Sequence, residues 1–124
     1  MNLYESSEDY LERILILSEQ KGNVRSIDIA ESMGFSKPSV SVAMKKLKEN
    51  GFIIVEDNGS IILTEKGLAI ANKTYEKHKI ISKFLIKLGV SNENALADAC
   101  KIEHDLSDES FDALKKFISE EFNK

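Results

Sequence analysis

The chain is poor in the residues that stabilise small secreted proteins or form membrane spans. Its 124 residues include one cysteine, one proline and no tryptophan. A single cysteine cannot form a disulfide within the chain, which favours a reducing cytoplasm over a secreted setting. No apolar run approaches the roughly 18 residues of a membrane span, and the opening stretch lacks the basic and apolar regions of a signal peptide. We therefore expect a cytoplasmic protein with an ordinary hydrophobic core.

Basic residues are in the minority overall, but they are concentrated in the middle of the chain. The formal net charge is −4. Residues 25–91 carry eleven basic and seven acidic side chains, whereas residues 1–24 and 92–124 have net charges of −3 and −5. The net charge argues against a nucleic-acid partner, but a basic middle between acidic ends is compatible with a DNA-facing centre. Ordinary surface variation would give the same pattern, so charge alone leaves both interpretations open.

The first third of the chain has the pattern of a helix followed by a helix-turn-helix motif. Apolar residues recur at helical spacing over residues 5–19. A second helix is expected to begin near Ser26, a plausible N-cap, and to end at Gly34. A third is expected after Ser36, with Pro38 in its first turn, where a missing N–H costs nothing. Two helices joined by so tight a turn have the spacing of a helix-turn-helix.

The pattern then changes to that of a β-hairpin. Asn58-Gly59 lies between two β-rich runs, 52–56 and 60–63, and both residues tolerate positive φ. A hairpin directly after a helix-turn-helix is the arrangement of a winged helix. Three further helices are expected, over about residues 65–88, 92–105 and 108–122.

The expected elements divide into two domains of a mainly α fold. Residues 1–64 are predicted to form a winged helix-turn-helix domain with a small β-hairpin wing. Residues 65–124 are predicted to form a linker helix followed by an all-helical domain.

The expected third helix carries the candidate DNA contacts. In a helix-turn-helix, the second helix of the motif lies in the major groove with its N-terminal residues nearest the base edges. Hydroxyl groups can bond to bases or phosphates, a valine can contact a thymine methyl, and lysine binds phosphate without reading sequence. The candidates are Ser36, Lys37, Pro38, Ser39, Ser41, Val42, Lys45 and Lys46. The alternative is a winged helix used only for protein contacts, with serines as caps and lysines as a solvated face.

The rarest side chains of the chain lie close together near its end. Cys100, Glu103 and His104 have the i, i+3, i+4 spacing of one helix face, and thiolate, carboxylate and imidazole groups all bind metals. The candidate metal ligands are Asp9, Glu12, His78, Cys100, Glu103 and His104. Each residue alone has a structural explanation, as a buried cysteine, a surface histidine or a first-turn acid. The hypothesis therefore requires three helices to converge.

Four stretches of the sequence carry a family resemblance. They are EDYLERIL, DIAESMGFSKPSVSVAMKKLKENGFI, LTEKGLAIA and DACKIEHDLSDE. In this order they resemble the first helix, the helix-turn-helix, the wing exit with its linker helix, and the metal-binding helix of the diphtheria-toxin-repressor family of metal-dependent transcriptional regulators. The resemblance covers about residues 5–122. It is strongest to the short manganese-regulator branch, which lacks the SH3-like third domain of longer members.

The resemblance implies the same six ligands, with one departure from the manganese branch. Cys100 stands where that branch has glutamate and resembles the iron-responsive branch. The iron-responsive branch, however, has methionine at the position of Asp9. Its additional second-site ligands fall at Ser82 and Leu96, which are not suited to bind metal.

The mixed donor set leaves the metal open. Hard carboxylates suit Mn²⁺, whereas a thiolate favours softer or later metals. Mn²⁺ and Fe²⁺ are both credible activators, and Zn²⁺ or Co²⁺ would bind in vitro because raw affinity follows the Irving–Williams order. One ion or a two-ion cluster is possible, and Glu12 and Glu103 would supply the bridging carboxylates of a cluster.

The resemblance implies a regulator, in the usual sense of the family a repressor, that binds palindromic operator DNA as a homodimer when loaded with Mn²⁺ or Fe²⁺. Its target genes would serve metal uptake or homeostasis. Bound metal would link the first helix to the C-terminal helices. It would thereby favour the spacing of the two DNA-binding domains of the dimer that permits DNA binding. The expected dimer face comprises Ala95, Ala99, Ile102, Leu106, Phe111, Leu114, Phe117 and Ile118. The alternative is that these residues only pack in the core of the monomer.

Two other classes of function are alternatives. A winged-helix regulator controlled by an organic ligand or by oxidation of Cys100 would be indifferent to metal. A small metal hydrolase, with Glu103 as general base beside a metal-bound water, would need an open coordination position. The sequence has no glycine-rich phosphate loop and no nucleophile–base pair, so we expect a protein that is not an enzyme.

Overall fold

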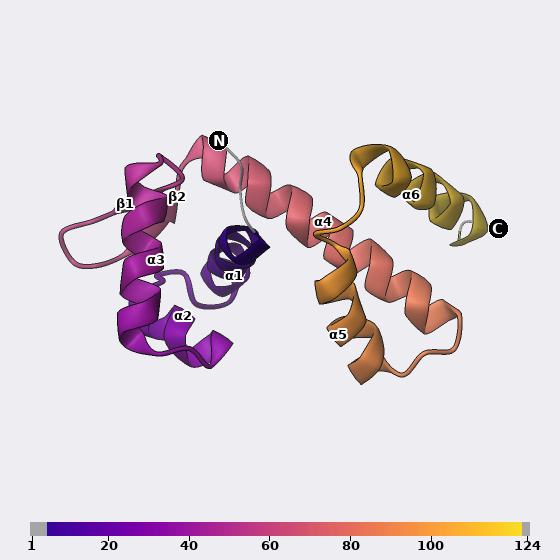
Figure 1. Ribbon diagram of the computed structural model, residues 1–124, viewed down its shortest axis with the longest axis horizontal. Helices are drawn as coiled ribbons and strands as arrows, with labels where there is room; N and C mark the ends of the chain where they lie inside the picture. Colours follow the sequence, from indigo (N-terminus) through magenta and orange to yellow (C-terminus); the bar gives the residue numbers. More distant parts are fainter. Residues whose placement is uncertain (1–4, 123–124) are drawn as a thin grey trace. The chain divides into compact units, whose positions relative to one another are not determined.

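The computed structural model describes residues 5–122, which form a mainly α fold with one antiparallel hairpin (Figure 1). The elements are α1 (Glu5–Lys21), α2 (Ser26–Met33), α3 (Lys37–Glu49), β1 (Ile53–Val55), β2 (Ile61–Leu63), α4 (Glu65–Lys87), α5 (Asn92–Ile102) and α6 (Asp108–Phe122). This order confirms the predicted winged helix followed by a helical domain. None of the helices within the described range has the length and apolarity of a membrane span.

The chain divides into two compact units, the first ending at Lys73 and the second beginning at Thr74. The long helix α4 therefore contributes residues to both units. The functional boundary expected between residues 64 and 65 stays a prediction.

The first unit contains the predicted helix-turn-helix. Gly34 ends α2 with a φ of 71°, and its neighbour Phe35 donates its N–H to the carbonyl of Ala30 at 3.1 Å. Ser36 caps α3 by accepting the N–H of Ser39 at 3.3 Å. One face of α3 is buried, through Val40, Met44 and Leu47. The helix consequently packs one stripe inward and leaves the opposite face to solvent.

The N-cap expected at Ser26 is wrong. Arg25 occupies the capping position and Ser26 is the first residue of α2. The carboxylate of Asp28 accepts the N–H of Arg25 at 2.9 Å and pairs with Lys21 at 2.7 Å. These bonds lower the pKa of Asp28, with the Lys21 contact as the largest cause. The Asp28 carboxylate thus satisfies the backbone N–H of the N-cap residue, which is the part of a capping box that the third helical residue supplies.

The predicted hairpin is present, with Asn58-Gly59 in its turn as expected. Glycines alone have positive φ in the described chain, so Asn58 does not, whereas Gly59 has a φ of 88°. Gly59 donates to the carbonyl of Glu56 at 2.9 Å, and Glu56 donates to that of Ser60 at 2.9 Å. Asn58 contributes through its side chain, which accepts the N–H of Ser60 at 3.0 Å. The turn therefore needs one left-handed residue, Gly59, and Asn58 contributes an Asx-type bond rather than a positive φ.

The wing leads into α4 through a close contact between backbones. The hydroxyl of Thr64 donates to the carbonyl of Gly51 at 2.7 Å and accepts the N–H of Gly67 at 3.1 Å, which caps α4. Gly67 lies so near β1 that a Cβ there would be 2.0 Å from the carbonyl oxygen of Phe52. The start of α4 is thus packed directly on the chain leaving the helix-turn-helix.

The second unit consists of the later part of α4 with α5 and α6. The helix expected to reach residue 105 ends at Ile102 instead. Glu103 follows as the C-cap, with helical φ and ψ of −57° and −26°, and its N–H still bonds the carbonyl of Ala99 at 3.0 Å. The spacing of Cys100 and Glu103 on one face is therefore preserved, whereas His104 lies in the turn beyond.

Much of the apolar face expected to form a dimer contact fills the core of the single chain. Ala95, Ala99, Phe111 and Ile118 are each 6% exposed or less. Phe117, in contrast, is 54% exposed. The sequence pattern alone does not distinguish the two roles, since both need apolar residues at helical spacing.

Candidate metal centre

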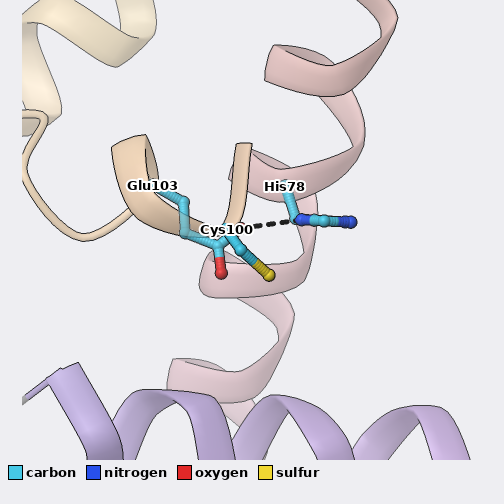
Figure 2. Close-up of side chains that lie close together, drawn as sticks. All are labelled: His78, Cys100 and Glu103. Carbon is cyan, nitrogen blue, oxygen red and sulfur yellow. Dashed lines mark hydrogen bonds and ion pairs between the residues drawn. The ribbon is translucent and has the colours of Figure 1, made fainter. Parts of the chain in front are cut away.

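Three of the six predicted ligands come together within the second unit. His78 projects from α4 toward Cys100 on α5 and toward Glu103, which directly follows α5 (Figure 2). One ligand atom from each of these three residues lies within 4.8 Å of the others. Donors around one ion at roughly 2.0–2.3 Å are separated by no more than about 4.6 Å. The geometry and the imidazole, thiol and carboxylate chemistry therefore fit a single transition-metal ion with little movement.

The carboxylate of Glu103 is buried and interacts with His78. Glu103 is 2% exposed, and its Oε2 lies 3.0 Å from Nδ1 of His78, the contact drawn as a dashed line in Figure 2. Hydrogen bonds with Cys100 and with Glu103 raise the pKa of His78 to about 10, although burial opposes the shift. A buried carboxylate is costly unless it is paired. In this structure a protonated His78 therefore supplies the positive charge that the carboxylate needs.

The second oxygen of the Glu103 carboxylate faces the other histidine. Oε1 is buried, has no hydrogen-bond partner among the described residues, and lies 3.5 Å from Nε2 of His104. His104 does not join the group formed with Cys100, contrary to the expectation of one shared helix face.

The two remaining predicted ligands lie on α1 in the first unit. Asp9 is half-buried and Glu12 is 5% exposed. Acidic side chains are rarely buried to this extent without a charged or metal partner. Their role as ligands stays a prediction.

All eight candidate DNA contacts lie on the exposed face of α3 or at its N-cap. Val42 is 56% exposed. The hydroxyl of Ser36 is engaged twice, as the cap of α3 and as a donor to the hydroxyl of Ser39 at 2.8 Å. The Ser39 hydroxyl accepts this bond and, like any hydroxyl, also has a hydrogen to donate.

Two residues beside the group were not anticipated as functional. The hydroxyl of Ser82 donates to the carbonyl of His78 at 2.7 Å, one turn along α4. Lys77 is 8% exposed and reaches the carbonyl of Leu106, in the α5–α6 connection, at 3.3 Å. No sequence signal marks Lys77, because a lysine on a lysine-rich helix is expected to be solvated.

The raised pKa of His78 predicts how the metal-free protein responds to pH. Its folded pKa of about 10 exceeds the ordinary value of 6.5. The stabilisation is therefore complete below the unfolded pKa and is lost as pH rises through the folded one. Urea unfolding in chelator at about pH 6 and about pH 9 should show a larger loss for the wild type than for His78→Gln. Parallel losses in the two proteins would contradict the shift.

Two signatures of known protein families match successive parts of the chain. The signature described as "Iron dependent repressor, N-terminal DNA binding domain" matches residues 2–61. The signature described as "Iron dependent repressor, metal binding and dimerisation domain" matches residues 64–121. The group formed by His78, Cys100 and Glu103 thus lies in the part that matches a metal-binding domain.

Individual relatives are transcriptional regulators. A helix-turn-helix-type regulator of Methanocaldococcus jannaschii is 40% identical over 116 residues, which are 92% of this chain and 93% of that protein. The regulator MntR of Geobacillus kaustophilus is 38% identical over 113 residues, 91% of this chain and 80% of that protein.

Solved structures show the same fold. The manganese regulator SloR superposes with a TM-score of 0.82 at 34% identity, over 91% of this chain and 53% of that chain. A manganese-dependent transcriptional repressor in complex with manganese has a TM-score of 0.82 at 27% identity, over 91% and 52%. This chain thus spans about half the length of these two solved chains. Since both signatures and the relatives agree, the chain belongs to the iron-dependent repressor family of metal-dependent transcriptional regulators, which is the diphtheria-toxin-repressor family.

Proposed function

We propose that the chain is a repressor that binds palindromic operator DNA as a homodimer when Mn²⁺ or Fe²⁺ occupies a site built on His78, Cys100 and Glu103. The observation that carries the proposal is the buried Glu103 carboxylate, 3.0 Å from His78 and within reach of the Cys100 thiol. We propose that its target genes serve metal uptake or homeostasis, so that bound metal would repress further metal uptake.

Metal and proton compete for this site. A bound divalent ion supplies positive charge to the carboxylate, thiolate and imidazole donors. His78 must release its proton to offer a nitrogen lone pair, and it then no longer compensates Glu103. The raised pKa of His78 therefore makes metal affinity depend on pH, weaker in acid and stronger in alkali.

The donor set favours a transition metal over Mg²⁺ or Ca²⁺, since a thiol and an imidazole join the carboxylate. Cys100 is exposed, so the ion would be accessible from solvent at this edge of the site. Zn²⁺ and Co²⁺ are expected to bind in vitro as well. The separate contacts of the Glu103 oxygens with His78 and His104 support a bridging role for this carboxylate if a second ion binds.

Asp9, Glu12 and His104 complete the proposed ligand set. The support for Asp9 and Glu12 is the family resemblance of the first helix together with the burial of the Glu12 side chain. Ligands drawn from both α1 and the second unit would let metal change the affinity for DNA, because α1 packs against the helix-turn-helix.

The proposed DNA-reading surface is the exposed face of α3. Ser39 and Val42 are suited to base edges, whereas Lys45 and Lys46 are suited to phosphates. The capped N-terminus of α3 adds backbone N–H groups directed at a phosphate. A dimer would present two such helices to the two halves of a palindrome.

The test is DNA binding measured by fluorescence anisotropy under anaerobic, reducing conditions. The probe is a palindromic duplex selected from random sequence by the protein, in separate selections with Mn²⁺, Fe²⁺, Zn²⁺, Co²⁺ and chelator. We expect affinity about 10–100-fold tighter with Mn²⁺ or Fe²⁺ than in chelator. Equal affinity in metal and chelator would refute the proposal and favour control by another ligand or by oxidation of Cys100.

A further inference from the structure

The α5–α6 connection, residues 103–107, is held by two consecutive residues of α4. His78 contacts Glu103 at the start of the connection, 3.0 Å between Nδ1 and Oε2. Lys77 reaches its far end, where Nζ donates to the carbonyl of Leu106 at 3.3 Å. Adjacent helix residues point about 100° apart, so this pair contacts the connection at two separated places.

Lys77 is held in a well-defined position. It is 8% exposed, and its Nζ lies 3.7 Å from a carboxylate oxygen of Asp108, the first residue of α6, and 5.7 Å from the ring centre of Phe111. An ammonium group is rarely so buried unless charges, carbonyls or aromatic rings replace water. Around Lys77 a carbonyl, a carboxylate and an aromatic ring replace water, and all three belong to the connection or to the first turn of α6.

We infer that Lys77 is a positioning residue of the proposed metal site: by holding the connection against α4, it keeps the Glu103 carboxylate facing His78 and Cys100. The inference rests on the proposed function. Glu103 lies at the end of α5, where the helical hydrogen bonds stop and the chain would otherwise be free to move. A carboxylate in such a place needs an external contact to stay in the geometry that a metal requires.

The experiment compares Mn²⁺ affinity of the whole chain in three variants, by competition with a fluorescent chelator. Lys77→Met keeps an unbranched stem against Phe111 but loses the ammonium group. Lys77→Arg keeps the charge and the donors. Lys79→Met is the matched control, because Lys79 is an exposed lysine on the same helix that also lies over an aromatic ring, 4.4 Å from the centre of Tyr75.

Loss of a group that supports a metal ligand typically costs about 10–100-fold in affinity. We expect a loss of this size in Lys77→Met, wild-type affinity in Lys79→Met, and recovery of most of the affinity in Lys77→Arg. Equal Mn²⁺ affinity in the wild type and Lys77→Met would overturn the inference while leaving the proposed function intact. A wild type that binds no Mn²⁺, Fe²⁺, Zn²⁺ or Co²⁺ would overturn the proposed function itself.

Hydrogen–deuterium exchange in chelator separates positioning from general stabilisation. In Lys77→Met, amide exchange should accelerate in residues 103–107 and remain unchanged in α5 before Cys100. Uniform acceleration throughout α4, α5 and α6 would show that Lys77 only stabilises the unit and would overturn the inference. If Lys77→Met fails to fold, Lys77→Gln, which is too short to reach Leu106, takes its place with the same criteria.

Discussion

Replacement of Glu103 by glutamine should abolish metal-dependent DNA binding while leaving a folded protein. The amide has nearly the same shape as the carboxylate, so packing around this 2% exposed side chain is retained. It has no negative charge to offer a divalent ion, and only one of its two polar atoms can accept a bond. Removing even a supporting group costs about 10–100-fold in metal affinity, so loss of a central ligand should cost at least about 100-fold.

Metal affinity and operator binding of Glu103→Gln should be measured beside those of Asp98→Asn. Asp98 is an exposed acid on the same helix, which makes it a control for the loss of one negative charge. We expect Asp98→Asn to behave as the wild type. Retention of metal activation in Glu103→Gln would show that this group is not the metal site. A similar loss of metal affinity in both variants would show that Glu103 acts only through the overall negative charge of the protein.

Replacement of Gly67 by alanine should destabilise the first unit, even though alanine is the better helix former. A Cβ at this position would lie 2.0 Å from the carbonyl oxygen of Phe52, and that oxygen also accepts the N–H of Thr64 at 3.1 Å. The gain in helix propensity is about 1 kcal/mol at most. Relief of the overlap must move backbone and break the Thr64 bond, so we expect a net loss of about 1–3 kcal/mol.

The loss should appear in urea unfolding of the metal-free chain as a lower midpoint. Asn72→Ala is the matched control, because Asn72 is an exposed residue of the same helix and the first unit. It should be neutral or slightly stabilising, as alanine favours helix at an open site. An unchanged midpoint in Gly67→Ala would mean that α4 can shift away from β1 without cost.

Local features of the sequence were sufficient to predict most of the fold. The cap at Ser36, the proline that follows it and the left-handed glycine at Gly34 act through bonds within a few residues, so they identify the third helix and the turn before it without tertiary information. The errors were also local. Arg25 rather than Ser26 is the N-cap of α2, and the Asp28 carboxylate accepts the backbone N–H of Arg25.

The candidate site could be predicted only in part. Cys100 and Glu103 are three residues apart, so helical geometry alone places them on one face. His104 was expected with them, but it is not part of the group that Cys100 and Glu103 form with His78. Helix ends depend on a balance of small terms that a periodic pattern does not reveal.

The sequence by itself determined the order of the elements, the helix-turn-helix and the choice of candidate metal ligands, because periodicity, capping and chemical type are properties of neighbouring residues. Only the tertiary structure decided that His78 meets Glu103, 25 residues away, and that Lys77 is buried among carbonyl, carboxylate and ring. It also decided that Gly67 is needed for a close backbone contact. These facts depend on how helices pack, and packing joins residues whose separation in sequence carries no local signal.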